Sequence, residues 1–339
     1  MGDSATPKPP EPLPTGPWAG PDWEAFAPPQ PLVVALSGGA DSTALLLACH
    51  QRWPGQVQAV HVNHGLQASA ANFERHCQTL CQRLGVPLSI HRLSLALQPG
   101  QSLEQEARQV RYEALARAAL ALGQGAGVVL AHHADDQVET VLLALTRGAG
   151  LPGLAAMPER MERHGVVFFR PWLSVPGEAI RAWLTQVGVP WEEDPSNQDE
   201  RFTRNRIRHQ VLPVLQAQFP AMRTTFARTA QHAAQAQALL LEVGQADLAQ
   251  CGQPPRIAAL QALSEARLHN VLRVWLNAQN LPPSTAQLQA LVSQIRACQT
   301  RGHHIDLKVG QGRVVRKGEA LVGYNRPLDF GPEAPTSSL

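Results

Sequence analysis

The chain has 339 residues, of which 44% are hydrophobic and 17% charged, so it can build two domains with cores of their own and is not disordered throughout. Its formal net charge of +2 excludes a strongly basic or acidic protein, so contact with nucleic acid would depend on local clusters of basic residues. No signal peptide opens the chain and no apolar run reaches membrane-spanning length, so we expect a cytoplasmic protein without membrane contact.

Residues 1–31 are rich in proline and show little apolar periodicity. Such a composition does not build a core, and we expect a disordered or extended lead-in that Trp18 and Trp23 anchor locally.

The stretch Leu32–Leu36 is a short apolar run, typical of a strand that is buried on both faces of a parallel sheet. A glycine-bearing loop, SGGADS (residues 37–42), follows, and Thr43–Ala48 reads as a buried helix. Small residues let backbone N–H groups approach a ligand closely, and a helix N-terminus favours phosphate. The loop matches neither GxxxxGK[ST] nor GxGxxG. The alternative interpretation is an ordinary tight turn.

Strand and helix patterns alternate beyond this loop. We expect further strands at residues 56–62, 88–93, 128–131 and 166–169, and helices at 71–84, 102–122, 138–145 and 177–187. This order predicts an α/β fold with a doubly wound, mostly parallel sheet in a domain of residues 32–220. We expect a second, smaller and mainly helical domain at residues 221–326, with three short strands near its end, and a loose tail at 327–339.

The five cysteines give no sign of a metal site, because no CxxC pair occurs. Cys77 and Cys81 lie four residues apart on the apolar face of an expected helix, and we interpret them as buried free thiols. An odd number of cysteines without a disulfide framework fits a reducing compartment.

Polar side chains gather where the expected strands end. Asp41 adds a carboxylate beside the loop, which makes sense next to phosphates only with a divalent cation such as Mg²⁺; by itself it could equally be a helix N-cap. The string HHADDQVE places His132, His133, Asp135, Asp136 and Glu139 after the strand at 128–131. Paired carboxylates can hold a metal, bind an ammonium group or accept a proton, whereas the alternative is a helix N-terminus that carries acids for its dipole.

A third cluster, WEEDPSNQDERFTRNRIR (residues 191–208), changes from acidic to basic along its length. One interpretation is a solvated surface segment whose charges compensate one another. The other is a hinge whose arginines meet the phosphates of ATP or nucleic acid, with Arg108 and Arg111 extending the basic patch.

Six motifs occur in a fixed order: SGGADS, HVNHGL, EARxxRY, AHHADDQVET, TRGAGLPGLAAM and EDPSNxxxxxxRNRIR. Together they resemble the tRNA(Ile)-lysidine synthetase family of the PP-loop ATP-pyrophosphatase superfamily, over about residues 32–220. The resemblance implies an adenine nucleotide alpha hydrolase-like fold and a ligase that uses ATP and L-lysine on an isoleucine tRNA with a CAU anticodon. The C2 oxygen of the wobble cytidine attacks the α-phosphate and pyrophosphate leaves; the lysine amine then displaces AMP. The product, lysidine, pairs with A instead of G, so the codon read changes from AUG to AUA.

The resemblance also implies roles for residues of this chain. ATP would be held by the loop, at Ser37, Gly38, Gly39, Ala40, Asp41 and Ser42, with Mg²⁺ at Asp41. Catalytic roles fall to Asp41, His133, Asp136 and Glu139, where Asp136 or Glu139 would bind the lysine ammonium and accept its proton. Substrate contacts are expected from Arg108, Arg111, Asp136, Glu139, Arg147, Arg204, Asn205 and Arg208. Basic residues of the second domain would grip the tRNA stem: Arg267, Arg273, Arg301, Lys308, Arg313, Arg316 and Lys317.

Three other functions are weighed against this one. A tRNA thiolase would activate the base in the same way but needs reactive cysteines or cluster ligands, which the spacing of the five cysteines does not favour. An amidotransferase-type synthetase needs a glutaminase domain or partner, and no such domain is readable. An ATP-binding sensor would leave the second and third clusters without a role. The sequence leaves the oligomeric state open, a homodimer included.

Overall fold

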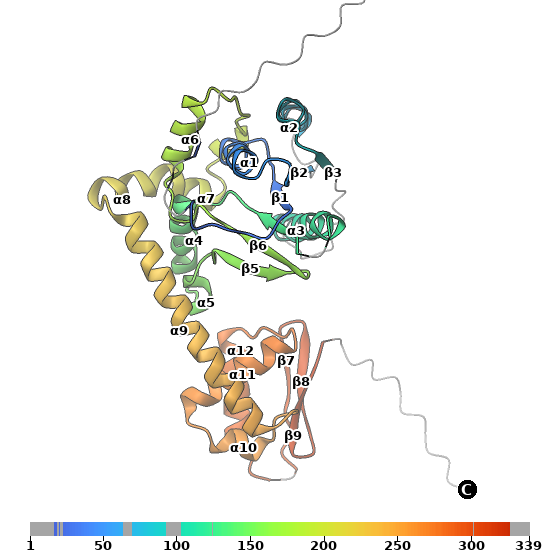
Figure 1. Cartoon of the computed structure of the whole chain (residues 1–339). Helices are drawn as coiled ribbons and strands as arrows, with labels where there is room; N and C mark the ends of the chain where they lie inside the picture. The colour runs from blue at the N-terminus through green and yellow to red at the C-terminus, as the bar shows by residue number, and fades with distance from the viewer. Residues whose placement is uncertain are drawn as a thin grey trace, which may run out of the picture. The chain divides into compact units, whose positions relative to one another are not determined.

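The structure is a computed structural model that describes residues 17–18, 20, 23–63, 70–92, 103–123, 125–300 and 302–325. The chain divides into two compact units, Met1–Ala233 and Ala234–Leu339 (Figure 1). The division falls inside one 30-residue helix, α9 (Met222–Cys251), whereas the sequence predicted a domain boundary at residues 220–221. The predictions for residues 1–16, for Arg301 and for the tail at 327–339 lie outside the described residues.

The first unit is built on a six-stranded sheet in the order β3-β2-β1-β4-β6-β5. The strands are β1 (Leu32–Ala35), β2 (Val57–Asn63), β3 (Leu88–Arg92), β4 (Gly127–Val129), β5 (Arg160–Arg163) and β6 (Val166–Phe169). All neighbours run parallel except β5, which pairs antiparallel with β6 at the edge. The predicted mostly parallel sheet is confirmed, and β1 lies near its middle, between β2 and β4.

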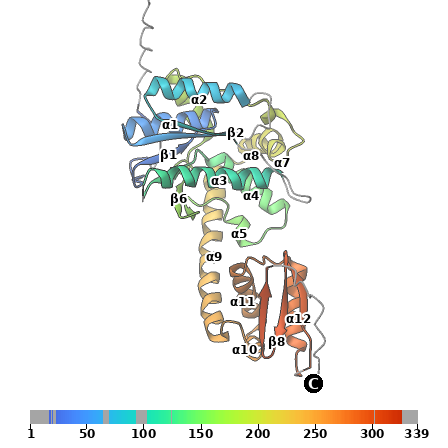
Figure 2. The ribbon, with the colours of Figure 1, turned by 90° about the vertical axis from the view of Figure 1, so that its right-hand side faces the viewer.

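Helices cover both faces of this sheet. The helices of this unit are α1 (Ala40–Arg52), α2 (Ala70–Leu84), α3 (Leu103–Ala121), α4 (Ala134–Thr146), α5 (Leu151–Leu154), α6 (Gly177–Gln186), α7 (Thr203–Arg206) and α8 (Leu212–Gln218), with a 3₁₀ turn at Pro195–Gln198 and a π-helical turn at Ile207–Val211. Leu32 and Val34 pack with α1, α2 and α6, whereas Val33, which points to the opposite face, packs with α3. Figure 2 shows α1 and α2 on one side of the sheet and α3 on the other. The chain is therefore doubly wound, as predicted.

Two tryptophans near the N-terminus belong to the core on the α1 face. Trp18 and Trp23, the expected local anchors of the proline-rich segment, are buried. Their rings lie 5.1 Å and 6.0 Å from the ring of Trp172, which is fully buried. Trp172 in turn forms an isolated parallel bridge with His133. The described end of the lead-in thus supports the backbone that carries His133.

The second unit packs three helices, α10 (Ile257–Ala262), α11 (Glu265–Ala278) and α12 (Thr285–Ala297), with one small antiparallel sheet. Its strands are β7 (Asp306–Val309), β8 (Gly312–Lys317) and β9 (Ala320–Tyr324), in the order β7-β8-β9. The side chains of Ser264 and Ser284 cap α11 and α12 by accepting hydrogen bonds from backbone N–H groups. Among the described residues of the whole chain, no helix combines the length and the apolar character needed to cross a membrane.

Candidate active site

The SGGADS loop is held by the side chain of one of its own residues. Ser42, which is buried, accepts hydrogen bonds from the backbone N–H groups of Ser37 and Gly38, at 3.1 and 3.2 Å. Its hydroxyl lies 3.1 Å from the carbonyl oxygen of Gly39, to which it donates. The backbone N–H of Gly39 donates to the hydroxyl of Ser37 at 3.3 Å, so three amides of the loop are engaged inside it. The N–H groups of residues 40–42 start α1 and have no acceptor within the helix, which leaves them for a phosphate.

The two adjacent glycines of the loop have different reasons to be glycine. Gly38 has a φ of +93°, and a Cβ there would lie 3.1 Å from the ring of Phe73 and 3.2 Å from the sulfur of Cys77. Gly39 has a φ of −77°, and a Cβ there would meet its nearest protein atom at 3.6 Å. Folding thus requires glycine at position 38, whereas at position 39 only the approach of a ligand would require it.

Asp41 is not the N-cap of α1, because Gly39 holds that position. Its Oδ1 is buried and has no hydrogen-bond partner, and its Oδ2 lies 3.6 Å from Nε2 of His133 and 3.9 Å from the guanidinium of Arg181. A carboxylate oxygen without a partner beside a phosphate loop fits a hard cation such as Mg²⁺. No group of three or more His, Cys, Asp or Glu side chains within the described residues is arranged to hold a metal. An ion at Asp41 would therefore depend on substrate phosphates for further ligands.

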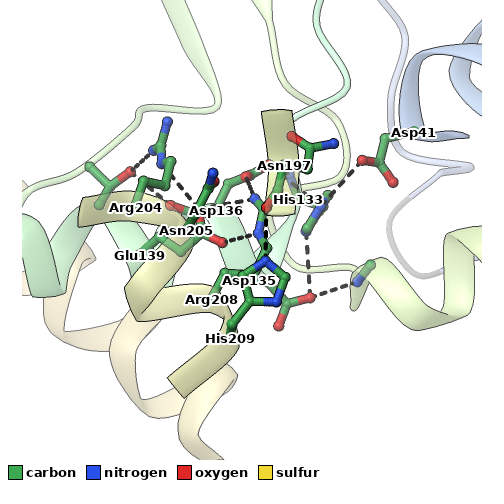
Figure 3. A network of polar contacts seen from close by, with 12 residues as sticks. Asp41, His133, Asp135, Asp136, Glu139, Asn197, Arg204, Asn205, Arg208 and His209 are labelled. Carbon is green, nitrogen blue, oxygen red and sulfur yellow. Dashed lines mark hydrogen bonds and ion pairs between the residues drawn. The ribbon is translucent and has the colours of Figure 1, made fainter. Parts of the chain in front are cut away.

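His133 lies at the centre of the site, at the N-terminus of α4, and is 3% exposed. Its Nε2 is 3.6 Å from carboxylate oxygens of both Asp41 and Asp136, and its Nδ1 is 3.5 Å from Asp135 (Figure 3). Burial lowers the pKa of His133, but the carboxylates of Asp136, Asp41 and Asp135 outweigh it and hold the pKa above its ordinary value. The ring thus joins the phosphate loop to the acidic start of α4.

His132 has a different environment from its neighbour. Its Nδ1 accepts a hydrogen bond of 3.3 Å from Nε of the buried Arg170. Burial lowers the pKa of His132 to about 3, because the positive charges of Arg170, Arg111 and Arg108 add to the desolvation and outweigh the opposing charge of Asp136. The imidazole is neutral at physiological pH, in agreement with its interpretation as a packing residue.

The three acids of α4 have three different sets of partners. Asp135 accepts hydrogen bonds from Arg223 and from the backbone N–H of Gly177. Asp136 accepts from the backbone N–H of His133, at 3.1 Å, and from Arg208, at 3.2 Å. Burial raises the pKa of Asp136, but His133, His132 and Arg208 outweigh it and hold the pKa below the ordinary value, so this group stays ionised.

Glu139 is fully enclosed. Arg208 donates to its two oxygens at 2.6 and 3.1 Å, and Nε of Arg204 lies 3.0 Å from Oε2. Burial raises the pKa of Glu139, while Arg208 and Arg204 oppose that rise. Since both oxygens are occupied and none of the side chain is exposed, this carboxylate does not present a free surface to an amine. The structure therefore does not give Glu139 the predicted contact with lysine.

The third cluster meets the other two. Arg204 and Arg208 point to Glu139 and Asp136 (Figure 3), and the N–H of Glu192 donates to the carbonyl of Gly38. Asn205, however, is buried and donates to the carbonyls of Ser196 and Asp199, at 2.8 and 2.9 Å. Its amide therefore stabilises its own segment and makes no hydrogen bond to the acids of α4.

Three further arginines were predicted to contact substrate. Arg147 is exposed at the C-cap of α4, roughly 20 Å along the helix axis from His133. Arg108 is exposed on α3, where its guanidinium lies 5.6 Å from the centre of the ring of Tyr112. Arg111 is half-buried one turn further along α3, and it reaches the site through its charge, which acts on His132. Arg147 therefore lies at the far end of α4 from His133, and its predicted contact with substrate stays a prediction.

Two family models match this chain. The family model of the PP-loop domain matches residues 23–215, and the model of the TilS substrate binding domain matches residues 256–322. A tRNA(Ile)-lysidine synthase from Polaromonas naphthalenivorans is 57% identical over 291 residues, which cover 86% of this chain and 88% of that relative. The chain belongs to the tRNA(Ile)-lysidine synthase family.

Other tRNA(Ile)-lysidine synthases differ in length. The enzyme from Bordetella pertussis is 41% identical over 302 residues, which cover 85% of this chain and 94% of that one. The enzyme from Pseudomonas aeruginosa is 43% identical over 261 residues, which cover 72% of this chain and 58% of that one. The chain thus spans almost all of some curated members of the tRNA(Ile)-lysidine synthase family and little more than half of others.

A solved structure shares the fold of this tRNA(Ile)-lysidine synthase family member. The U34-tRNA thiolase NcsA from Methanococcus maripaludis, with its [4Fe-4S] cluster, matches with a TM-score of 0.52 and 14% identity, covering 62% of this chain and 74% of that one. At this identity the likeness concerns the fold alone. All five cysteines here are free and buried, and burial raises the pKa of Cys77 and of Cys81 to about 12. Such thiols are poor nucleophiles and poor metal ligands.

Sequence reasoning missed two contributors to the site. Arg223, in the first turn of α9, binds Asp135, and the N–H of Gly177 binds the same carboxylate. Arg223 is one basic residue in a long helical stretch rich in Ala and Gln, and Gly177 follows a proline at the start of a helix. Nothing in either local pattern indicates a partner so far away in the sequence.

Proposed function

We propose that this chain ligates L-lysine to C2 of the wobble cytidine of tRNA(Ile) with a CAU anticodon, with ATP converted to AMP and pyrophosphate. Family membership supports this proposal, and so does one observation of the site. The ring of His133 lies 3.6 Å from Asp41 at the phosphate loop and 3.6 Å from Asp136 at the start of α4. Groups suited to a nucleotide and groups suited to a cationic amine are thus neighbours.

In the first step we assign nucleotide binding to the loop and to the start of α1. The N–H groups of residues 40–42 are placed to donate to phosphate oxygens, and Asp41 would hold Mg²⁺, which offsets charge on the pyrophosphate when bound. The cytidine O2 attacks the α-phosphorus, and the bond from that phosphorus to the bridging oxygen breaks. We assign a contact with the α-phosphate to His133, because its ring lies next to Asp41. The wobble base has to leave the anticodon stack to reach this point.

In the second step the amine of lysine attacks C2 of the adenylated cytidine, and the C2–O bond breaks to release AMP. We assign the ammonium to Asp136, which is ionised and partly exposed, with 15% of its side chain accessible, and this carboxylate would accept the proton that the ammonium loses before its nitrogen attacks. Glu139 was expected to share this role, but it has both oxygens on Arg204 and Arg208. We propose that it fixes these two arginines, with Arg208 holding Asp136 in turn.

The second unit supplies fewer free cations for tRNA than the sequence predicted. Arg267 is paired with the buried Asp247, and Arg313 with Asp306. Arg316 donates to three backbone carbonyls, those of Gly318, Thr300 and His303. We assign phosphate contacts to Arg273, Lys308 and Lys317, which are exposed. The other three cations stabilise the unit itself.

The deciding experiment is mass analysis of tRNA(Ile) transcript after incubation with the full chain, ATP, Mg²⁺ and lysine. We expect one lysine added at the wobble cytidine, with AMP and pyrophosphate released in equal amounts. Without lysine, adenylated tRNA should accumulate, and a transcript with uridine at the wobble position should not react. Addition of sulfur in place of lysine would indicate a thiolase, and nucleotide binding without any change to the tRNA would indicate a sensor.

A further inference from the structure

Arg223, which is 88 residues from Asp135 in the sequence, binds this acid of the site. Arg223 lies in the first turn of α9, with 17% of its side chain exposed. Its Nε donates to Asp135 at 2.6 Å, one terminal nitrogen donates to Glu178 at 3.1 Å, and the other donates to Gln216 at 3.2 Å. The guanidinium thus joins α4, α6, α8 and α9 around the carboxylate of Asp135.

Asp135 is fixed from both sides. Arg223 holds Oδ1, and the backbone N–H of Gly177 donates to Oδ2 at 2.9 Å. The same Oδ2 lies 3.5 Å from Nδ1 of His133, which is buried and has no hydrogen-bond partner. Asp135 faces the nitrogen of the ring that is turned away from Asp41 and Asp136.

Gly177 closes the space beside this ring. A Cβ at position 177 would lie 2.8 Å from Cε1 of His133 and 3.1 Å from Oδ2 of Asp135. The ring therefore has Asp135 against Nδ1 and the backbone of α6 against its edge. A carboxylate that is fixed in this way attracts the Nδ1 edge of the ring by its charge across 3.5 Å, and so favours one direction for the opposite nitrogen.

We propose that Arg223 is a positioning residue for His133 and acts through Asp135. This inference rests on the proposed function, because the consequence for catalysis depends on His133 meeting the α-phosphate. Without Arg223, Oδ1 of Asp135 loses its charged partner, and the carboxylate keeps only the N–H of Gly177 and is free to turn away from Nδ1. The ring then no longer has a fixed angle toward the nucleotide. Reacting groups that are misplaced by about 1 Å lose on the order of a hundredfold in rate.

A clamp that merely joins four helices would behave differently. Loss of such a clamp would lower the melting temperature and the amount of folded enzyme, with kcat per folded molecule unchanged. The test therefore compares Arg223→Ala, Arg223→Lys and Asp135→Asn in the full chain, with Arg228→Ala as the matched control. Arg228 lies on the same helix just over one turn further along and is exposed.

The kinetic measurement is lysidine formation with saturating tRNA. We expect Arg223→Ala to lower kcat roughly ten- to a hundredfold per folded molecule, with the KM values for ATP and lysine within about twofold of wild type. Arg223→Lys should recover part of the loss, and Arg228→Ala should show none. Since Arg223 acts through Asp135, the double variant Arg223→Ala with Asp135→Asn should be no slower than the slower single variant. Losses that multiply in the double variant, or an unchanged kcat in Arg223→Ala, would overturn the proposal.

A spectroscopic measurement does not depend on catalysis. The ring signals of His133 in an NMR spectrum, identified by their absence in His133→Asn, should shift in Arg223→Ala and in Asp135→Asn and stay in place in Arg228→Ala. Unshifted signals in Arg223→Ala would refute the positioning role even if the wild-type chain makes lysidine. Shifted signals in a chain that makes no lysidine would keep the positioning and reject the proposed function.

Discussion

Arg208 and Glu139 form a bidentate salt bridge. Nε of the arginine donates to Oε1 of the carboxylate at 2.6 Å, and one terminal nitrogen donates to Oε2 at 3.1 Å. Glu139 has no exposed surface, whereas 30% of the Arg208 side chain is exposed. Breaking a buried pair by removing one charge costs about 3–5 kcal/mol, and exposure of the arginine reduces that cost. The pair therefore stabilises the fold and also fixes the arginine that holds Asp136.

We predict that Glu139→Gln lowers the free energy of unfolding of the first unit by about 2 kcal/mol. It should also slow lysine attack more than adenylation, because Arg208 would no longer hold Asp136 in place. Thermal unfolding and separate measurements of pyrophosphate and AMP release check both parts. Wild-type stability together with wild-type activity at low lysine would contradict this role.

Alanine substitutions at Gly38 and Gly39 should have different effects, so each variant serves as the control for the other. Gly38→Ala should destabilise the protein by about 1–3 kcal/mol, because the backbone there has a positive φ and the methyl group would crowd Phe73 and Cys77. Gly39→Ala should stay within about 0.5 kcal/mol of wild type and weaken ATP binding at least about tenfold. Melting temperatures and ATP titration by calorimetry separate the two effects. Unchanged ATP affinity in Gly39→Ala would show that phosphate does not approach that position.

Asp41 offers a test of the proposed cation site. We predict that Asp41→Ala keeps the fold, because the variant removes a buried oxygen that has no hydrogen-bond partner. It should lose pyrophosphate release and no longer respond to added Mg²⁺, because the carboxylate beside the phosphates is gone. The measurement is pyrophosphate release against Mg²⁺ concentration, with circular dichroism as the control for folding. Full pyrophosphate release by the variant would count against the assignment.

The cysteines separate this enzyme from a thiolase. Because all five thiols are buried and burial raises the pKa of Cys77 and Cys81 to about 12, we expect the native protein to react with a disulfide reagent at pH 8 far more slowly than the unfolded chain. A variant with all five replaced by serine should still form lysidine if it folds. If the variant folds but loses catalysis, a tRNA thiolase would again be a candidate function.

Much of the site could be predicted because its parts follow strands of one parallel sheet. The run from Leu32 to Ser42 indicates strand, phosphate loop and helix, and the structure has β1, the loop and α1 in that order. Asp136 and Glu139 are three residues apart, a spacing that puts both on one face of a helix, and both contact Arg208. Local pattern and sheet topology together were sufficient for these features.

The other features of the site and the fold depend on contacts between residues that are far apart in the sequence, which local sequence patterns do not predict. Arg223 and Asp135 are 88 residues apart, and their meeting is decided by how α9 begins. Arg147 follows the acids of α4 closely in sequence, but the length of the helix carries it to the other end. The edge strand β5 shows only one apolar residue, Met161, and forms through its pairing with β6.

The place where α9 crosses from one unit to the next has a practical consequence. A protease needs an extended peptide in its cleft, and the chain between residues 222 and 251 is hydrogen-bonded into a helix throughout. The start of this helix is held by the buried Met222, and its end by the buried Leu248 and Cys251. Limited proteolysis should therefore cut other exposed segments before it separates the two units. A gene that is split at codon 233 would divide α9, and each product would carry part of this helix with an unpaired end.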